Sequence, residues 1–330
     1  MMENIRLFDP SEAEYEAIFA IEQAVWPENP TTVTEFKHAD ASKKPTEFKQ
    51  RFVVERNGRL VAFAPVGQVT WASDDGRYRM NITVHPDFER QGIGTAVYEH
   101  ILTILHQRTP KPLILESGTY QHKPQSIQFL KKRGFRQVMR WIISTLAVPN
   151  FDVNQFIALR QKIADQEIEI RSLSAQKPLD PNWQQNLWEL DWALTLDEPL
   201  PYEPKKVPFA DYVQKFIHEP GAVHEAWFVA LADGRYVGMS QLMISEIDPT
   251  LMFTGFTGVI RSHRCRGLAT VLKTVAIEYA QNKGIQLIRT GNEESNPMYT
   301  LNRKLGFTDL TATLAFEKAV ANNDSEMKIR

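Results

Sequence analysis

Two short stretches of this sequence combine glycine with basic residues in a spacing that suits the binding of a phosphate group. Residues 264–269 read RCRGLA, and residues 90–94 read RQGIG. A helix N-terminus offers unsatisfied N–H groups and a partial positive charge. Small residues let a ligand approach the backbone, and arginine adds a charge-assisted contact. We therefore predict that each stretch is a phosphate-binding loop.

A helix is indicated directly after each loop by apolar residues three and four positions apart. They are Leu268, Val271, Leu272, Val275, Ala276 and Tyr279 after the second loop, and Ile93, Val97, Ile101, Ile104 and Leu105 after the first. This spacing places them on one continuous helix face. An apolar, strand-like run precedes each loop. Each loop is therefore predicted to connect a strand to an amphipathic helix.

The two loops belong to a repeat of long period. Residues 57–58 (NG) and 233–234 (DG) each separate two apolar runs, which is the strongest short-range signal for a β-hairpin. A Gly-Phe pair follows each loop after a further apolar run, at 134–135 and at 306–307. Because these matches keep the same order and a nearly constant separation, we interpret the chain as a tandem duplication.

The same order of elements is predicted in both copies. A strand (5–8; 167–172) is followed by a helix opened by Asp-Pro (9–10; 180–181) and a hairpin (52–55 with 60–69; 226–231 with 236–244). A strand (79–84; 253–260) leads into the loop and its helix. Then come a strand (113–117; 285–290), a short helix ending at Gly-Phe and a last strand (138–148; 311–317). The predicted domains are an N-terminal module at 1–149, a helical connector at 150–166 and a C-terminal module at 167–330.

The composition excludes several classes of protein. With 330 residues, 24% of them charged, and a net charge of −2, the chain lacks the basic excess of a nucleic-acid or anionic-membrane binder. No apolar run reaches the roughly 20 residues of a membrane span, and the first residues lack an export signal. Cys265 is the single cysteine, which excludes an internal disulfide and a thiolate zinc site. We expect a cytoplasmic protein without a metal, a nucleic-acid partner or a membrane partner.

The second loop also resembles a family signature. Arg264-x-x-Gly267-x-Ala269 is similar to the Gln/Arg-x-x-Gly-x-Gly/Ala motif of the GNAT (GCN5-related N-acetyltransferase) superfamily. Asn296 and residues 305–307 (LGF) resemble the last helix of that fold and the strand after it. The resemblance covers nearly the whole chain as two modules. It implies an α/β fold in which each module has a mixed, mostly antiparallel sheet, splayed between its fourth and fifth strands and flanked by helices.

The resemblance further implies that acetyl-CoA is the cosubstrate, with pantetheine in the splay and the pyrophosphate on the loop. Enzymes of the superfamily transfer the acyl group directly to an amine. The implied CoA-binding residues of the second module are Val259, Ile260, Arg261, Arg264, Arg266, Gly267, Leu268, Ala269, Thr270, Asn292 and Asn296. Those of the first module are Val84, Arg90, Gln91, Gly92 and Gly94, and whether that module binds CoA stays open.

The first module departs further from the family pattern than the second. Glu89 stands where the motif has Gln or Arg, and a carboxylate there would repel a pyrophosphate. The frequent general-acid tyrosine of the family is replaced by Leu130 in the first module and by Asn302 in the second. Asparagine donates a hydrogen bond and leucine does not. Tyr299, on the same helix as Asn302, is an alternative proton donor. We therefore predict a degenerate first module and an active site in the second.

A general base is needed because an ammonium group cannot attack a thioester. The glutamate that the family commonly carries on its fourth strand has no counterpart in 253–258. Glu293 joins Tyr299 and Asn302 as a candidate catalytic residue, because it directly follows the predicted fifth strand. The other nearby carboxylates are Glu294, Glu246 and Asp248, and the sequence does not choose among them. Direct transfer requires no nucleophilic cysteine, so Cys265 is not given that role.

The leading hypothesis is an acyl-CoA-dependent N-acyltransferase, most simply an acetyltransferase, that acts on the amine of a small molecule. A non-catalytic acyl-CoA sensor or scaffold is one alternative. An acetyltransferase of protein N-termini or lysines is another. An acceptor-lining role is considered for Trp183, Trp188 and Trp192, and a lid role for the Pro-rich run at 199–208. The oligomeric state, the length of the acyl chain and the acceptor stay open.

Overall fold

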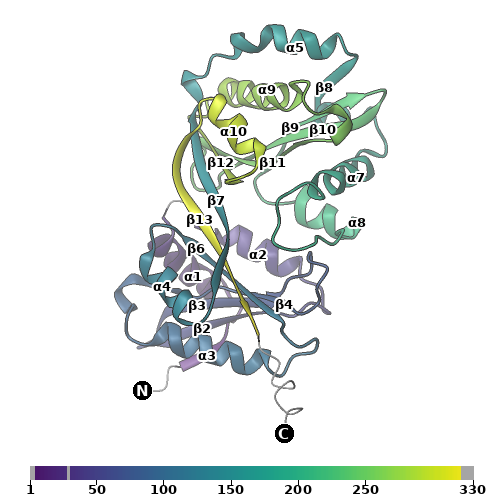
Figure 1. Cartoon of the computed structure of the whole chain (residues 1–330). Coiled ribbons are helices and arrows are strands. Elements are labelled where there is room, and N and C mark those ends of the chain that lie inside the picture. The colour runs from purple at the N-terminus through teal and green to yellow at the C-terminus, as the bar shows by residue number, and fades with distance from the viewer. Residues whose placement is uncertain (1–3, 28–29, 321–330) are drawn as a thin grey trace. The chain divides into compact units, whose positions relative to one another are not determined.

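The computed structural model describes residues 4–27 and 30–320 (Figure 1). The chain divides into two compact units. Unit 1 holds the chain up to Met139, the segment Pro201–Lys205 and the chain from Leu314 onward, and unit 2 holds Arg140–Leu200 and Lys206–Thr313. In each unit a mixed sheet carries apolar clusters on both of its faces. The predicted α/β fold of two sheet modules is therefore confirmed.

Unit 1 is built on the strand order β1-β2-β3-β4-β6-β13, with the short β5 beside β3. Side chains alternate across β2 and β3, so Val53 and Phe63 pack with one helix pair and Phe52 and Ala62 face the opposite cluster. The helices are α1 (Glu12–Val25) and α2 (Val33–Ala41) on the first face, and α3 (Ile93–Leu105) and α4 (Pro124–Lys132) on the second. The strands are β1 (Asn4–Leu7), β2 (Lys49–Arg56), β3 (Arg59–Gln68), β4 (Arg77–Met80), β5 (Thr83–Val84), β6 (Ile114–Tyr120) and β13 (Thr308–Ala319).

Unit 2 repeats this plan with the strand order β13-β7-β12-β11-β10-β9-β8. Its strands are β7 (Arg136–Ala147), β8 (Ile168–Ser172), β9 (Ala222–Ala232), β10 (Arg235–Ile244), β11 (Leu251–Val259) and β12 (Leu287–Glu293). One face packs against α6 (Leu173–Gln176), α7 (Trp183–Thr195) and α8 (Phe209–Tyr212). The other packs against α9 (Leu268–Asn282), and α10 (Pro297–Lys304) follows β12.

The connector at 150–166 contains three short helices. It forms the one-turn helices η2 (Val148–Asn150) and η3 (Val153–Phe156) and then α5 (Ile157–Ala164). Its apolar residues Phe151, Phe156 and Leu159 pack against the apolar cluster that contains α9. The connector is therefore part of the core of unit 2.

A short parallel ladder marks the predicted splay in each sheet. In unit 2 it joins β11 and β12 over residues Leu251 to Phe253, and β11 then continues to Val259 without a partner in β12. In unit 1 the ladder joins β4 and β6 over residues Arg77 to Arg79. The parallel pairing then ends in both units, and we call the region beyond it, where the two strands share no backbone pairing, the wedge.

The last strands differ from the expectation of two continuous modules. Residues 141–147 of β7 pair with β12 of unit 2, although they follow the sequence of the first copy. The chain from Leu314 onward, at the end of the second copy, belongs to unit 1. Both strands are also longer than predicted, at 136–147 and 308–319. Each unit thus receives a strand segment from the other copy of the sequence.

The predicted helix starts at Asp-Pro are wrong in both copies. Helix α1 begins at Glu12 after Ser11, and α7 begins at Trp183 after Asn182. The reason is visible in the second copy, where Asp180 accepts hydrogen bonds from the Asn182 N–H at 2.9 Å and the Tyr236 hydroxyl at 2.9 Å. Asp180 therefore closes a turn ahead of the helix. Among the helices of the described residues, none is both long and apolar enough to cross a membrane.

Candidate acyl-CoA site

The two loops follow the same backbone path. In unit 2 the turn η5 (Arg261–His263) is followed by Cys265 at φ 61° and Gly267 at φ 92°, after which α9 begins. In unit 1 the turn η1 (Pro86–Phe88) is followed by Arg90 at φ 61° and Gly92 at φ 86°. Within the described chain, no side chain caps the N-terminus of α9 or α3. The first N–H groups of both helices thus lack a capping side chain and can receive an anion.

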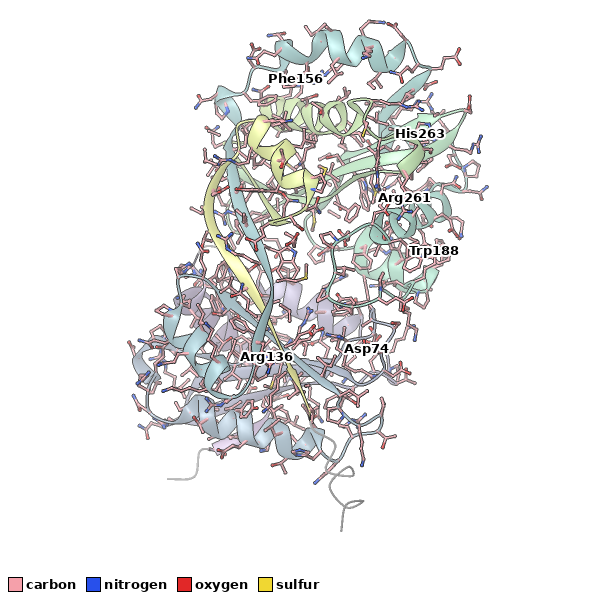
Figure 2. The ribbon with its side chains drawn as sticks, viewed as in Figure 1. Asp74, Arg136, Phe156, Trp188, Arg261 and His263 are labelled. Atoms are coloured by element: carbon pink, nitrogen blue, oxygen red, sulfur yellow. The ribbon has the colours of Figure 1, made fainter. Side chains whose placement is uncertain are left out.

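The arginines of the second loop have partners within unit 2. The Arg264 side chain donates to the Val259 carbonyl at 2.8 Å and pairs with Asp197. Arg261 donates to the same carboxylate at 2.8 Å, and Figure 2 shows Arg261 beside His263 at this loop. These hydrogen bonds keep the pKa of Asp197 below its usual value. Arg264 and Arg261 therefore brace the loop, and its backbone N–H groups remain the direct candidates for phosphate contact.

Gly267 lies close to a side chain of the connector, and its predicted role of letting a ligand approach the backbone stays a prediction. A Cβ atom at Gly267 would lie 2.8 Å from the Leu159 side chain of α5. At the equivalent Gly92 of unit 1, nothing among the described residues lies within 4 Å of such an atom. Arg266 donates to the Ser262 carbonyl at 3.1 Å, within the loop.

A β-bulge lies in β11 where the splay begins. The pairing with β10 runs from Ser240 opposite Thr257 to Leu242 opposite Thr254, so two residues of β11 face Gln241. A Cβ atom at Gly255 would lie 2.4 Å from the Gln241 side-chain oxygen, so any larger residue there would require the Gln241 side chain to shift. A bulge releases backbone groups from the ladder. Those groups lie next to the wedge and can bind the amides or the thioester carbonyl of an acyl-pantetheine chain.

The asparagines predicted to follow the fifth strand connect β12 to α10. The Asn302 side-chain amide donates to the Asn292 carbonyl oxygen at 2.5 Å. Asn302 is 1% exposed, and its own Oδ1 atom has no hydrogen-bond partner in the described residues. Asn296 caps α10, because its Oδ1 accepts from the Met298 N–H at 2.9 Å. Asn292 and Asn302 are thus brought together beside the wedge, and Asn296 is occupied by its helix.

Tyr299 and Glu293 have other partners. The Tyr299 hydroxyl donates to Asp309 at 2.8 Å, and this bond raises the pKa of Tyr299. Glu293 accepts from the Ser295 N–H at 2.8 Å, and Glu294 pairs with Arg140 at 3.0 Å. The structure therefore does not bring Tyr299, Asn302 and Glu293 together around one point. Their catalytic roles stay predictions.

Sequence reasoning missed a carboxylate in the apolar face of α7. Burial raises the pKa of Asp191 to about 7, and the charge of Glu198 adds to this shift. The pKa of Glu198 is also raised to about 7, because the surrounding atoms desolvate its carboxyl group although the residue as a whole is exposed. A signal was present in the sequence, because an acid interrupts an apolar stripe at the same place in both copies. The stripes are Ile18, Ile21, Glu22, Val25 and Leu187, Leu190, Asp191, Leu194.

Unit 1 fills the region beside its own loop. The Arg133 side chain of α4 donates to Thr95 on α3 at 2.7 Å and lies 3.5 Å from the centre of the Phe129 ring. That ring is also 3.4 Å from the position of a Cβ atom at Gly94. Leu305 stands at the place of Arg133 in the second copy and is buried. Helices α3 and α4 are thus bridged at the first loop.

The remaining side chains of the first loop also contact their own unit. Gln91 accepts from Arg56 at 2.5 Å and donates to the Asp87 carbonyl at 3.2 Å. Val84 ends the short strand β5, while Glu89 and Arg90 are exposed. The first loop therefore has the backbone conformation of a phosphate-binding loop, but hydrogen bonds within unit 1 hold the side chains around it.

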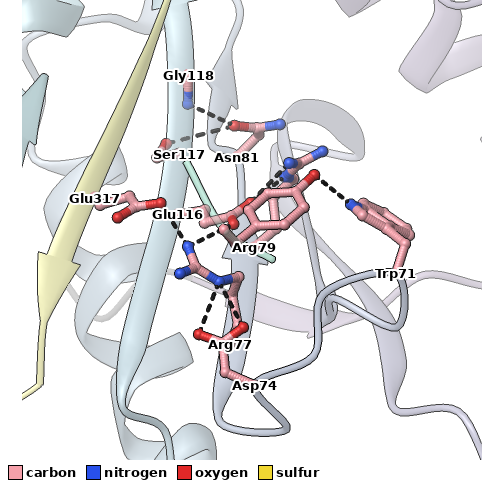
Figure 3. Close-up of polar contacts among 10 residues, drawn as sticks. Trp71, Asp74, Arg77, Arg79, Asn81, Glu116, Ser117, Gly118 and Glu317 are labelled. Carbon is pink, nitrogen blue, oxygen red and sulfur yellow. Dashed lines mark hydrogen bonds and ion pairs between the residues drawn. The ribbon is translucent and has the colours of Figure 1, made fainter. Parts of the chain in front are cut away.

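A buried ion network occupies the other face of the sheet in unit 1. Arg77 is 3% exposed and pairs with Asp74 at 3.1 Å and with Glu116 at 2.9 Å (Figure 3). The segment Pro201–Lys205 covers this network, and the Tyr202 hydroxyl accepts a hydrogen bond from Trp71 at 2.9 Å. Part of the Pro-rich run that was considered as a lid thus belongs to unit 1.

Two matches to one family model agree with this geometry. The model of the acetyltransferase (GNAT) family matches residues 15–135 and 186–307, and each match ends at the phenylalanine of a Gly-Phe pair. The chain therefore belongs to the acetyltransferase (GNAT) family, and it is a tandem GNAT protein. The enzyme class that this membership defines is the N-acetyltransferase.

Known proteins of this class resemble the chain. It is 38% identical over 65 residues to a [ribosomal protein bS18]-alanine N-acetyltransferase of Escherichia coli (strain K12), which is 20% of this chain and 41% of that relative. A tandem GNAT protein from the clavulanic acid biosynthesis pathway has a TM-score of 0.72 at 18% identity, over 98% of this chain and 100% of that one. A GCN5-related N-acetyltransferase from Sphaerobacter thermophilus has a TM-score of 0.68 at 15% identity, over 97% and 96%. Both structural likenesses show the shared fold.

Proposed function

We propose that this protein is an acyl-CoA-dependent N-acetyltransferase that acetylates the amine of a small molecule in unit 2. The observation that carries this proposal is the second loop. There, a strand that has parted from its parallel neighbour leads through the loop to an uncapped helix N-terminus. Members of the family use acetyl-CoA as cosubstrate. The loop suits an anion such as the pyrophosphate of acetyl-CoA, and the wedge suits the extended polar pantetheine chain joined to it.

The residues of unit 2 fit such a substrate. The N–H groups at the start of α9 would hold the pyrophosphate. The bulge in β11 and the unpaired Oδ1 atom of Asn302 offer polar partners to the pantetheine chain in the wedge. In unit 1 the bridge from Arg133 to Thr95 closes the corresponding region. This contrast supports chemistry in unit 2 and a degenerate unit 1.

The reaction requires a deprotonated acceptor nitrogen. The nitrogen forms a bond to the thioester carbonyl carbon, the carbon–sulfur bond breaks, and the nitrogen loses one proton to a base. The leaving thiolate takes up a proton from solvent or from a protein group. A carboxylate whose pKa lies near neutrality can serve as that base. Asp191 and Glu198, each with a pKa raised to about 7, meet this requirement.

A matched pair of substitutions tests the proposal. Thr270 and Thr95 hold the same place in the first turn of α9 and α3. Glutamate in a first helical turn favours the helix, so neither substitution is expected to unfold its unit. It places a negative charge where the pyrophosphate is proposed to bind. In calorimetric titration with acetyl-CoA, Thr270→Glu should weaken binding at least tenfold, and Thr95→Glu should leave it unchanged. Binding that survives Thr270→Glu would contradict the proposal.

A protein N-terminus is the second candidate acceptor. It is favoured by the 65-residue match to a [ribosomal protein bS18]-alanine N-acetyltransferase, which spans less than half of that relative. Thiol release from acetyl-CoA can be followed with two probes, an alanine-initiated hexapeptide and a set of small amines. Turnover of the peptide alone would favour this second candidate.

A further inference from the structure

Asp191 is a carboxylate that unit 2 leaves without a partner. It lies in the apolar stripe of α7, between Leu190 and Leu194, which are 3% exposed each. It takes part in no hydrogen bond or ion pair among the described residues. The equivalent Glu22 of unit 1 differs, because it accepts a hydrogen bond from the Thr31 N–H at 3.3 Å. A half-buried carboxylate without a partner is costly in free energy. A ligand of opposite charge would remove that cost.

The position of Asp191 is fixed next to the wedge. One turn further along α7, the Leu194 side chain lies 2.9 Å from the place of a Cβ atom at Gly258, in the splayed part of β11. After the helix, Asp197 binds Arg261 and Arg264 of the second loop. Glu198 follows directly, and its charge acts on Asp191. Helix α7 thus packs against the splayed part of β11 through Leu194, and Asp191 lies one turn before that contact.

A second observation independently indicates a polar ligand here. Tyr212 of α8 is 1% exposed, and its hydroxyl has no hydrogen-bond partner in the described chain. Tyr212 packs in the same apolar cluster as Leu190 and Leu194, the α7 residues on either side of Asp191. A buried hydroxyl without a partner costs free energy unless a ligand or water binds it. Tyr212 and Asp191 both lack a partner at the same place.

We propose that Asp191, Glu198 and Tyr212 form the acceptor site, and that the acceptor is a cationic amine whose ammonium group binds between them. Anionic acceptors such as amino acids with a free carboxylate would be disfavoured by the two carboxylates. This inference rests on the proposed acetyltransferase function. It adds the chemical class of the acceptor and names the residues that select it.

Calorimetric titration with three probes of similar length tests the inference. They are 1,4-diaminobutane, 1-aminobutane and 4-aminobutanoate, titrated into the full chain without acetyl-CoA at pH 8. Binding of 1,4-diaminobutane is expected to be at least tenfold tighter than that of 4-aminobutanoate. Asp191→Asn keeps the shape of the side chain and should weaken the diamine about tenfold to a hundredfold. Tyr212→Phe should weaken it less.

Glu189→Gln is the matched control on the same helix. Glu189 is exposed and pairs with Lys206 at 2.6 Å, so its substitution should leave diamine binding unchanged. Three outcomes would overturn the inference. They are 4-aminobutanoate binding as tightly as 1,4-diaminobutane, Asp191→Asn binding the diamine as tightly as the unchanged protein, and no binding of either 1,4-diaminobutane or 1-aminobutane. Acetyl-CoA is titrated separately. Loss of acetyl-CoA binding would defeat the proposed function, whereas normal acetyl-CoA binding with a failed amine titration would defeat this inference alone.

Discussion

At the scale of single residues, the duplication has kept a carboxylate in the first long helix of each copy. Burial raises the pKa of Glu22 to about 7, as it does for Asp191. The two acids interrupt the same apolar stripe, which predicts a common ancestral position. Their surroundings then diverged, because Thr31 donates to Glu22 while Asp191 lacks a partner among the described residues. The repeat is visible in sequence, but the difference in partners is visible only in the structure.

Stability should depend on pH through Asp191. Its pKa is about 7 in the folded protein and about 3.9 in an unfolded chain, so the folded state binds the proton more tightly. The stability that this group contributes is complete below pH 4 and is lost as pH rises through 7. Asp191→Asn should therefore raise the free energy of unfolding by about 1–2 kcal/mol at pH 8 and change it little at pH 4. Urea unfolding of the variant and of Glu189→Gln at both pH values measures this.

The two loop glycines should respond differently to alanine. Both Gly267 and Gly92 have a positive φ, which costs an L-residue about 1–2 kcal/mol. Only Gly267 has a neighbour within contact distance, the Leu159 side chain. Gly267→Ala should therefore destabilise its unit by at least 1 kcal/mol more than Gly92→Ala does. Hydrogen exchange of α9 and α3 in the two variants gives both values. Equal effects would mean that Leu159 moves aside without cost.

At the scale of elements, the sequence predicted best what depends on neighbouring residues. The hairpins at 57–58 and 233–234, the amphipathic helices and the strand–loop–helix order are all present. The site chemistry was harder to predict, because it depends on pairs that are distant in sequence. Asp197 pairs with Arg264 across 67 positions, and the Tyr299 hydroxyl, considered as an alternative proton donor, donates to Asp309 on the strand after its helix. No local sequence pattern predicts either of these two hydrogen-bonded pairs.

The attachment of α10 to β12 gives a prediction at this scale. Asn302 is buried and donates to Asn292, whereas Leu130 holds the same place in unit 1 within an apolar cluster. Asn302→Leu should change the stability of unit 2 little, because unit 1 accommodates leucine at the same place. It should, however, weaken acetyl-CoA binding. Leu130→Asn should destabilise unit 1 by about 1–3 kcal/mol, because the new amide has no asparagine opposite. Thermal unfolding and calorimetry of both variants separate the two effects. A stable Leu130→Asn variant would show that α4 is loosely packed.

At the scale of the whole molecule, the exchange of strand segments is the feature that the repeat could not reveal. Hydrophobic pattern predicts that a strand exists near 311–317, but not which sheet receives it. In the structure, Phe316 is fully buried in the cluster that contains Phe52 and Ala62 of unit 1. Phe307, only nine positions earlier, is 2% exposed and belongs to the cluster around α9 in unit 2. The segment from Phe307 through β13 thus contributes side chains to two cores.

This exchange predicts that two phenylalanines nine positions apart stabilise different units. Phe316→Ala should destabilise unit 1 by about 3–5 kcal/mol, because it opens a cavity in a core made mainly from the first copy. Phe307→Ala should cost a similar amount in unit 2. Hydrogen exchange with mass spectrometry would then show faster exchange in β2 and β3 for Phe316→Ala, and in β10 and β11 for Phe307→Ala. If Phe316→Ala loosened β10 and β11 instead, β13 would lie wholly in unit 2, and each copy would fold as a continuous module. The expected pattern would mean that residues 1–149 alone lack the part of the unit 1 core that Leu314 and Phe316 supply.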